Sequence, residues 1–413
     1  MRVTVATIGS RGDVEPALAL AIGLRDGGHQ VRFVAPPEHR AFVAERGLDH
    51  LDLHPMIADL ETPDENQSLA ARIRKFKAGR EHVIKQFDKV IEHSRETEFL
   101  AASITFAPAA LSVRDLYGIP VCLLCPTVPF VRTSAYPNPW LPPLPFGRLS
   151  NRLSYLLFEQ LMWQTVRSRV NRWRRKSLSL PAFPFFGFFS RIYSERIPFL
   201  VGVSRHAYPV PEDLPAGVRV TGRWFLKLEE SYRPPEKVAR FLSNGKPPLC
   251  ITFGSNPIAD KEKTLSALVD SLKATGRSAI LVGARSELGQ SRDFGDTMVS
   301  VDSIPFSWLF PQTDLVIHHG GAGVVACCLQ AGVPSIVIAN RSDQLAFGRR
   351  LFQLGLAPKP MLHSRLTTGK LISAINSVVH SKTMSSEAER IGRKIRTENG
   401  VADAVAHIDR FLK

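Results

Sequence analysis

The chain has 413 residues, of which 44% are hydrophobic and 22% are charged. This length exceeds what one core usually spans, so we expect two domains, and the composition excludes a disordered chain. The formal net charge of +15 at pH 7 favours acidic partners, such as nucleotide phosphates or anionic lipid headgroups. The five cysteines are an odd number, which favours a reducing compartment over a disulfide framework.

The sequence shows no pattern typical of a secretory signal or a membrane span. Residues 3–8 are too short for a signal-peptide core and are soon followed by charged residues. The longest uncharged stretch, residues 315–340, contains glycines, histidines and a proline, and fits a strand, loop, helix and strand better than a span. We therefore expect a cytoplasmic protein, either free or peripheral on the inner face of the membrane.

The first residues predict a β-α-β unit. Residues 2–8 form a β-branched strand pattern, residues 16–24 an apolar helix, and residues 31–35 a second strand. In such a unit the first strand and the helix start converge on residues 10–13, at the edge of the sheet where ligands bind. Asp13 is therefore either a catalytic carboxylate or a helix N-cap, which is a common role of Asp before an apolar helix.

Further along, residues 72–92 predict an exposed helix and residues 121–126 another buried strand. Cys122 and Cys125 have the C-x-x-C spacing, but both lie within the apolar run VCLLCP. We interpret them as core residues of the strand, because a redox pair needs accessible thiols.

The chain changes in character after a proline-rich loop over residues 126–145. From Arg148 to Lys176 eight basic residues accompany one acid, Glu159, and five phenylalanines follow within residues 182–189. The pattern predicts a long amphipathic helix with a basic end. Two interpretations remain open: an element that contacts a membrane surface or lines an apolar acceptor pocket, or a helix packed on the sheet with its charges in water. Phenylalanines gathered in one run argue against nucleic acid.

The second half begins with a proline-rich connection over residues 208–235 and again alternates strands with helices. We expect strands over residues 248–253, 278–282, 315–317 and 335–339, and helices over residues 262–275 and 324–330. This alternation predicts a second parallel sheet with helices on both faces.

The most informative stretch is residues 314–331, DLVIHHGGAGVVACCLQA. A strand that enters a helix through a glycine-rich turn leaves unpaired N–H groups at the helix start, and these favour a phosphate. The turn at residues 254–257 has the same chemistry, and the pair Asp343-Gln344 offers acceptor oxygens for sugar hydroxyls. Neither the strict dinucleotide fingerprint nor the P-loop occurs, so the pattern alone is also compatible with ordinary turns.

HHGGAG followed by AGVPSIVIANRSDQ resembles the donor-site signature of nucleotide-sugar glycosyltransferases, notably the bacterial glycopeptide-antibiotic and the sterol glucosyltransferases. GSRGDVEPALALAIGL, near the start, resembles their amino-terminal motif. The resemblance implies an α/β fold with two Rossmann-like, doubly wound parallel-sheet domains facing across a cleft (GT-B architecture). The implied division is an acceptor domain (1–215), a linker (216–235), a donor domain (236–385), and a C-terminal helix (386–413) that packs back on the first domain.

The resemblance also implies roles for individual residues. Asp13 matches the residue that is proposed in this family as the base that activates the acceptor hydroxyl. Ser10 is expected to be catalytic together with Asp13. The implied acceptor-binding residues are Arg11, Phe130 and Trp140, and the implied donor-binding residues are Gly254, Ser255, His319, Gly321, Ala322, Gly323, Val324, Asp343 and Gln344. Val324 departs from the pattern, because relatives usually carry a Thr or Ser there, whose hydroxyl can bond a phosphate. We expect this replacement to weaken the phosphate site without abolishing it.

We therefore expect an inverting glycosyltransferase that moves a hexose from a UDP- or TDP-sugar to a hydroxyl of a lipophilic acceptor. The chain contains no D-x-D sequence, so we expect no metal ion and no cofactor besides the nucleotide sugar. Expected partners are this donor, a hydrophobic acceptor and an anionic membrane surface, with no nucleic acid and a monomeric protein. Two alternatives stay open: a nucleotide-sugar isomerase or epimerase of similar build, and a catalytically weak nucleotide-sugar-binding protein.

Overall fold

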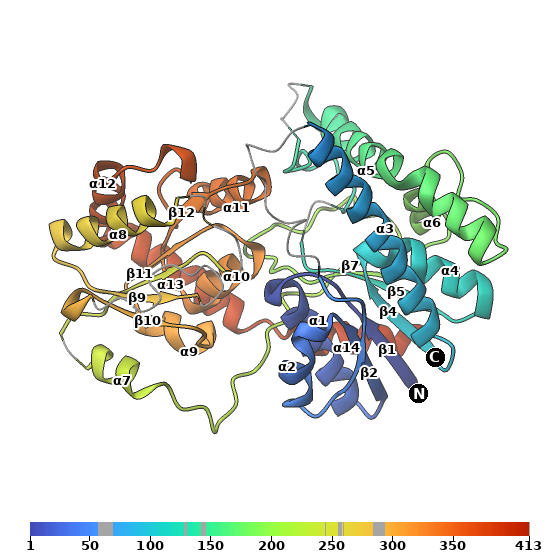
Figure 1. The fold of residues 1–413 in the computed structure, drawn as a ribbon, viewed down its shortest axis with the longest axis horizontal. Helices are drawn as coiled ribbons and strands as arrows, with labels where there is room; N and C mark the ends of the chain where they lie inside the picture. Colours follow the sequence, from blue (N-terminus) through green and yellow to red (C-terminus); the bar gives the residue numbers. More distant parts are fainter. Residues whose placement is uncertain are drawn as a thin grey trace. The chain divides into compact units, whose positions relative to one another are not determined.

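The computed structural model describes residues 1–56, 69–127, 130–141, 146–243, 245–254, 258, 260–283 and 294–412. The chain divides into two compact units. Unit 1 comprises Met1–Leu226 and Asn399–Lys413, and unit 2 comprises Lys227–Glu398. Each unit is built around its own parallel sheet with helices on both faces (Figure 1), so the predicted α/β class with two parallel-sheet domains is confirmed.

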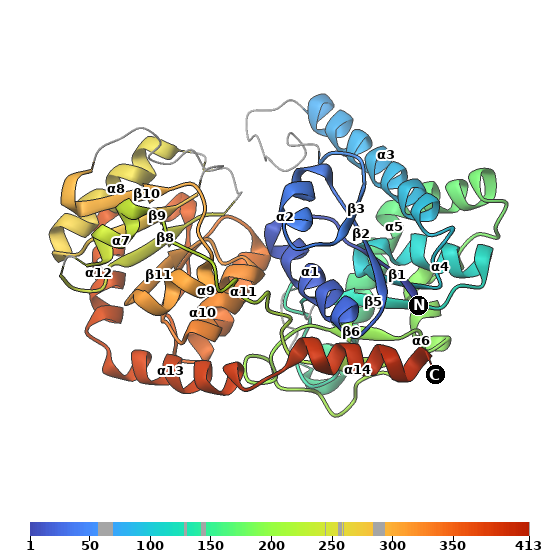
Figure 2. The ribbon, with the colours of Figure 1, turned by 90° about the horizontal axis from the view of Figure 1, so that it is seen from below.

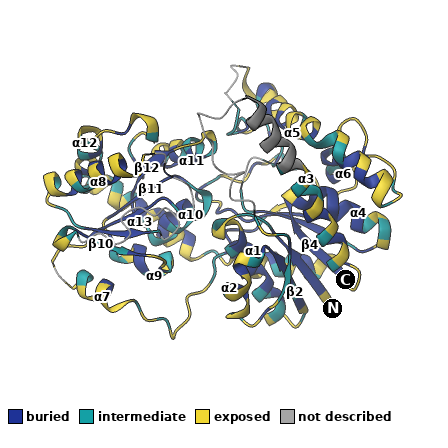
Figure 3. Ribbon diagram, in the orientation of Figure 1, coloured by how far each residue is buried: buried dark blue, intermediate teal, exposed yellow. Residues whose placement is uncertain are grey.

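Unit 1 contains a seven-stranded sheet with the order β3-β2-β1-β4-β5-β6-β7. All neighbouring strands are parallel, and the central strands are buried (dark blue in Figure 3). Because the strand order reverses between β1 and β4, the edge beyond their carboxyl ends is the expected ligand position. The strands are β1 Arg2–Ala6, β2 Gln30–Ala35, β3 Asp49–Asp52, β4 Phe99–Ser103, β5 Val121–Cys125, β6 Phe199–Val201 and β7 Val218–Val220.

Side chains alternate between the two faces of this sheet and form two cores. One core packs against α3 to α6, and the other packs against α1, α2 and α14. The helices are α1 Arg11–Asp26, α2 Arg40–Ala44, α3 Leu69–His93, α4 Ala107–Tyr117, α5 Gly147–Ser177, α6 Gly187–Ser194 and α14 Gly400–Leu412. Cys122 and Cys125 lie fully buried in β5, as predicted, and burial raises the pKa of Cys122 to about 12 and that of Cys125 to about 11.

The first helix differs from the prediction at its start. We expected it to begin at Pro16, whereas α1 begins at Arg11, with Ser10 as its N-cap in an extended conformation. Pro16 lies inside the helix, where its missing N–H removes the hydrogen bond that another residue would make to the carbonyl of Gly12. As a result, Asp13 belongs to the first turn of α1.

The carboxyl-terminal residues are shared between the units. Helix α13 (Lys382–Arg396) packs against α10 (Ala322–Ala331) in unit 2, while α14 packs against α1 in unit 1 (Figure 2). His29 bonds Asp409 at 2.9 Å, which joins the turn between α1 and β2 to α14. The predicted tail was a single segment over residues 386–413, and the predicted linker included β7. In the structure β7 adds to the sheet of unit 1, and its pairing with β6 places Val218 beside Phe199.

Gly23 permits the close approach of α14 to α1. A Cβ atom at Gly23 would lie 2.4 Å from Cγ1 of Val401. Ala is normally more stable than Gly inside a helix by about 1 kcal/mol, but we expect Gly23→Ala to loosen the docking of α14 at a cost of about 1–3 kcal/mol, as overpacking does. Hydrogen exchange of the α14 peptides measures this loss. Gly369→Ala is the control, because no atom lies within 4 Å of that Cβ position; equal exchange in both variants would contradict the packing argument.

Unit 2 contains a six-stranded parallel sheet with the order β10-β9-β8-β11-β12-β13. Its strand order reverses between β8 and β11, so the loops that follow these two strands meet at one edge. The strands are β8 Leu249–Thr252, β9 Ala279–Val282, β10 Met298–Val301, β11 Leu315–His318, β12 Ser335–Ala339 and β13 Met361–Leu362. One face packs against α8 (Lys261–Thr275) and α12 (Thr368–Val379), and the other against α7 (Glu236–Leu242), α9 (Phe306–Leu309) and α10 (Ala322–Ala331). Among the described residues, no helix has the length and apolar character needed to cross a bilayer.

Candidate functional site: a glycine-lined imidazole at a helix start, and a capped carboxylate

His319 brings together the two glycine-rich loops of unit 2. Its side chain is only 7% exposed. A Cβ atom would lie 3.0 Å from its Cε1 if placed on Gly254 and 2.3 Å from its Nε2 if placed on Gly321. The ring therefore lies between the loop after β8 and the start of α10, and both positions need the small volume of glycine. Ser255 lies outside the described residues.

The start of α10 offers backbone donors next to this ring. Gly321 is the N-cap, and the first intrahelical bond runs from Val325 N to Gly321 O, at 3.0 Å. The N–H groups of Ala322, Gly323 and Val324 consequently have no intrahelical acceptor. Together with the helix dipole they favour an anion. The predicted donor residues 319 and 321–324 thus form one structural feature.

Burial keeps both histidines of this loop neutral. It lowers the pKa of His319 to about 4, although the nearby carbonyl of Thr252 opposes the shift. It lowers the pKa of His318 to about 3, with a further contribution from His319. His318 Nδ1 accepts from Gly320 N at 3.0 Å, so its ring supports the loop and the proton resides on Nε2. At neutral pH, His319 therefore offers a neutral ring that can donate one hydrogen bond.

Val324 points its side chain into the core. It is 7% exposed and belongs to the apolar cluster that contains Val316 and Phe310. Its backbone N–H remains at the helix start, as described above. The side chain therefore contributes packing, and the lack of a hydroxyl leaves phosphate binding to the amides and His319.

Asp343 and Gln344 begin α11 (Ser342–Gln353), and their polar atoms are partly engaged. Gln344 Oε1 accepts from Asn340 N at 2.8 Å and from Arg341 N at 3.3 Å, while Arg341 pairs with Asp343 at 3.1 Å. We expected acceptor oxygens for sugar hydroxyls from both residues. The oxygen of Gln344 instead caps the helix, and its buried Nε2, which has no partner among the described residues, is the group that can bond a sugar. A buried donor of this kind gains a hydrogen bond from a ligand.

In unit 1, Asp13 closes the first turn of α1. Its Oδ2 accepts from the backbone N of Ser10 at 3.0 Å and from the Ser10 hydroxyl at 3.1 Å. Asp13 is therefore not the N-cap, which is Ser10, but the third residue of the helix, and its carboxylate closes a capping box with Ser10. A cap does not exclude catalysis, since Asp13 is exposed at the carboxyl edge of the sheet.

Gly9 packs against this carboxylate and His39 bonds Gly9, and the sequence analysis missed both residues in these roles. Gly9 has φ = +126°, and a Cβ atom there would lie 2.5 Å from Asp13 Oδ2. His39, 8% exposed, places Nε2 at 3.2 Å from the carbonyl oxygen of Gly9. A buried imidazole therefore holds the turn against which Asp13 packs.

The predicted acceptor residues separate into two places. Phe130 and Trp140 pack edge to face, with ring centroids 5.7 Å apart, and Phe158 of α5 completes the group at 5.5 and 5.3 Å. Beside it, Glu159 is buried and bonds Arg132, and burial raises the pKa of Glu159 while the ion pair opposes the shift. Arg11 instead pairs with Glu15 at 2.6 Å and lies over the ring of Phe42. An acceptor role for these residues stays a prediction.

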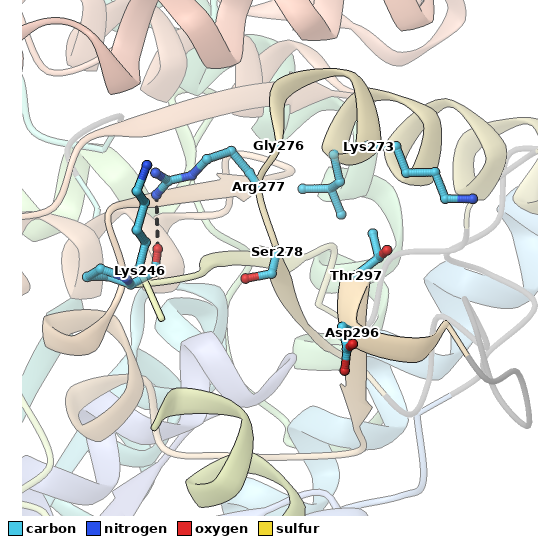
Figure 4. A pocket seen from close by; sticks show the side chains of 9 residues that line it. Lys246, Lys273, Gly276, Arg277, Ser278, Asp296 and Thr297 are labelled. Carbon is cyan, nitrogen blue, oxygen red and sulfur yellow. Dashed lines mark hydrogen bonds between the residues drawn. The ribbon is translucent and has the colours of Figure 1, made fainter. Parts of the chain in front are cut away.

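A surface hollow of about 390 Å³ occurs elsewhere in unit 2. Lys246, Lys273, Arg277 and Thr297 are among the residues that line it (Figure 4). These residues precede β8, β9 and β10 or end α8, so the hollow lies at the amino ends of the strands, opposite the His319 loop. Arg277 is already paired with Asp314, so the carboxylate offsets the charge that this guanidinium could offer to a ligand.

The described residues contain no group of three or more His, Cys, Asp or Glu side chains placed to hold a metal ion. Independence from metal nevertheless stays a prediction, because it concerns the reaction. Residues 304–308, between β10 and β11, contain two aromatic side chains of the kind that can stack on a nucleotide base. Within them Phe306 stacks on Phe310 at 4.5 Å and Trp308 packs on Tyr232 at 5.8 Å, so both aromatic rings already have protein neighbours.

Comparison with known sequences identifies related proteins along the whole chain. Residues 3–122 match the glycosyltransferase family 28 N-terminal domain, and residues 267–407 match the erythromycin biosynthesis protein CIII-like C-terminal domain. A sterol 3-beta-glucosyltransferase of Arabidopsis thaliana is 30% identical over 430 residues, which cover 100% of this chain and 68% of the plant protein. Fungal sterol 3-beta-glucosyltransferases are 29–31% identical, and the chain spans only 29–30% of their length.

Comparison with solved structures gives the same fold. The kitacinnamycin glycosyltransferase superposes with a TM-score of 0.76 at 17% identity, covering 100% of this chain and 99% of that protein. The glycosyltransferase VinC, solved in complex with dTDP, gives a TM-score of 0.67 at 15% identity and covers 99% of each chain. At such low identity these matches establish the fold only. The reaction has to be inferred from the residues of the site.

Proposed function

Because this chain belongs to the glycosyltransferase family that includes the sterol 3-beta-glucosyltransferase of Arabidopsis thaliana, we propose that it transfers a hexose from a nucleotide diphosphate sugar to a hydroxyl of a lipophilic acceptor. The donor class is UDP- or TDP-sugar, and the reaction inverts the configuration at the anomeric carbon. The observation that carries this proposal is the position of His319 between Gly254 and Gly321 at the start of α10.

The loop chemistry supports a diphosphate as leaving group. As the glycosidic bond to the donor breaks, negative charge develops on the diphosphate. The N–H groups of residues 322–324 and the neutral ring of His319 are donors fixed before the reaction, and such donors stabilise charge without reorganisation. The complex of VinC with dTDP supports a thymidine or uridine diphosphate as the ligand.

On the acceptor side, Asp13 is the proposed base. It takes the proton of the acceptor hydroxyl as this oxygen attacks the anomeric carbon, so the proton moves to the carboxylate while the electron pair forms the new C–O bond. Ser10 holds the carboxylate through two hydrogen bonds. The relatives that act on sterols, together with the aromatic group of Phe130, Trp140 and Phe158, support an apolar acceptor.

The direct test supplies purified protein with UDP-glucose and TDP-glucose, with and without sterols and long-chain alcohols, and follows products by mass spectrometry. We expect a glycosylated acceptor and free diphosphate only when an acceptor is present. Conversion of the donor without any acceptor would instead indicate an isomerase, and intact donor in all mixtures, despite diphosphate binding in a calorimeter, would indicate a binding protein.

His319→Ala is expected to weaken UDP binding by about 10–100-fold, the worth of one lost hydrogen bond to a charged group, with little change for uridine. Calorimetric titration with both ligands measures the difference. His380→Ala serves as the control, since His380 is an exposed histidine of the same unit. An equal loss for UDP and uridine would remove His319 from the phosphate site.

A further inference from the structure

Parts of α5 are exposed (yellow in Figure 3), and many of the exposed side chains along α5 and just before α6 are large and apolar. The inner face of the helix buries Tyr155, Phe158 and Trp163, so packing on the sheet accounts for one side only. Leu149, Leu153, Leu157 and Leu161 recur every four positions and therefore share one side of the helix. We call the following set the apolar strip: Phe146, Leu149, Leu153, Leu156, Leu157, Leu161, Met162, Phe185 and Phe186, with exposed fractions between 36% and 74%.

Phe185 and Phe186, the two members of the strip that follow α5 in the chain, are held in place by this helix. Trp163 Nε1 donates to Phe185 O at 2.9 Å, and Gln160 Nε2 donates to Phe186 O at 3.4 Å. The following residue, Gly187, has φ = +74°, and a Cβ atom there would lie 2.6 Å from the Trp163 ring. The turn that presents both rings is thus fixed by bonds and by a glycine, so their exposure is built into the fold.

The charges around the strip have one sign. Residues 147–194 contain a single acid, Glu159, which is buried and paired with Arg132. Arg174 and Arg191 are bonded to Asp115. The remaining cations make no ion pair with any described residue, although Arg167 lies over the Phe185 ring, 5.0 Å from its centroid. These cations are Arg148, Arg152, Arg167, Arg169, Arg172, Arg175 and Lys176.

We propose that the apolar strip docks on an anionic lipid bilayer, with α5 parallel to the surface and its cations among the headgroups. An interfacial helix needs exposed Leu and Phe on one side and basic residues beside them, and anionic headgroups supply the charge that this segment lacks. A second copy of the chain, with its net charge of +15, would add cations rather than neutralise them. The inference extends the proposed function, because a lipophilic acceptor could then reach the enzyme from the bilayer. Binding of the protein to the bilayer does not depend on catalysis and can be tested without it.

The test is co-sedimentation of the full chain with vesicles of phosphatidylcholine alone or mixed with phosphatidylserine, at low and high salt. We expect binding to the mixed vesicles that weakens with salt. Leu153→Gln combined with Leu157→Gln and Phe186→Ser should lower the partition coefficient at least tenfold, on the order expected for losing buried apolar surface. Arg172→Gln with Arg175→Gln should weaken binding to the mixed vesicles only. Leu228→Gln with Phe352→Ser is the matched control, because both residues are exposed apolar residues outside the strip.

Three results would overturn the proposal. The first is unmodified protein that sediments with neither kind of vesicle, and the second is strip variants that bind as well as the control. The third is a dimer in light scattering that the strip substitutions convert to a monomer, which would assign the strip to a second copy. UDP titration of each variant checks that it is folded. Transfer to a water-soluble acceptor, measured without vesicles, tests the proposed function separately.

Discussion

Asp13→Asn is expected to lower sugar transfer by about 10²–10⁴-fold, the usual contribution of a general base, while leaving nucleotide binding unchanged. The structure makes this substitution informative, because Asp13 Oδ2 also closes the first turn of α1 through Ser10. The amide oxygen of Asn can still accept both hydrogen bonds but cannot take the acceptor proton. Single-turnover rates with a saturating donor measure the effect.

Two further substitutions separate the base from the cap. Ser10→Ala removes only the hydroxyl bond to Oδ2, so we expect a modest loss of rate and a small loss of stability, about 0.5–1.5 kcal/mol. Gly9→Ala places a Cβ atom 2.5 Å from Oδ2 and should displace the carboxylate, lowering the rate more than the stability. If Asp13→Asn lowers the melting temperature while the rate per folded molecule stays the same, Asp13 is a cap only.

Local sequence patterns predicted the strands that are rich in β-branched residues, such as β1 and β12. They did not predict β4, whose sequence FLAAS has weak strand propensity, although it is fully buried beside β1. The strand exists because neighbours on both sides and helices on both faces enclose it, which is a tertiary effect. The three-residue strands β6 and β7 are equally invisible to periodicity, and for that reason the first unit extends beyond the predicted boundary.

The candidate site was likewise predictable from the sequence only in part. The residues of the loop after β11 are adjacent in sequence, so the pattern HHGGAG was enough to predict an anion site there. Contacts between distant segments were not predictable: His39 beneath Gly9, or Gly254 against His319. Nor does the sequence say that Gln344 uses its oxygen to cap a helix, because Gln at that position suits both a cap and a ligand. Orientation of single side chains depends on packing that only the fold defines.

The second large effect we expect is loss of stability of unit 2 in mild acid. Burial lowers the pKa of His318 to about 3 and that of His319 to about 4, from an ordinary value of 6.5. The unfolded chain therefore binds more protons than the folded chain below pH 6.5. Stability is complete above that pH and is lost as the pH falls towards 4. Since each unit of pKa difference corresponds to about 1.4 kcal/mol, the two rings together make a contribution of several kcal/mol.

Hydrogen exchange of β11 and α10 peptides between pH 4.5 and 7.5, corrected for the intrinsic exchange rate, measures this dependence directly. His318→Asn should flatten it, because one of the two titrating groups is gone, whereas His380→Asn, which replaces an exposed histidine of the same unit, should leave it unchanged. The slope with pH is the relevant quantity, since His318→Asn also changes the bond to Gly320 and hence the stability at every pH. An unchanged slope in His318→Asn would mean that this loop opens to admit the proton without unfolding, and the buried histidines would then not be the groups that make the unit sensitive to acid.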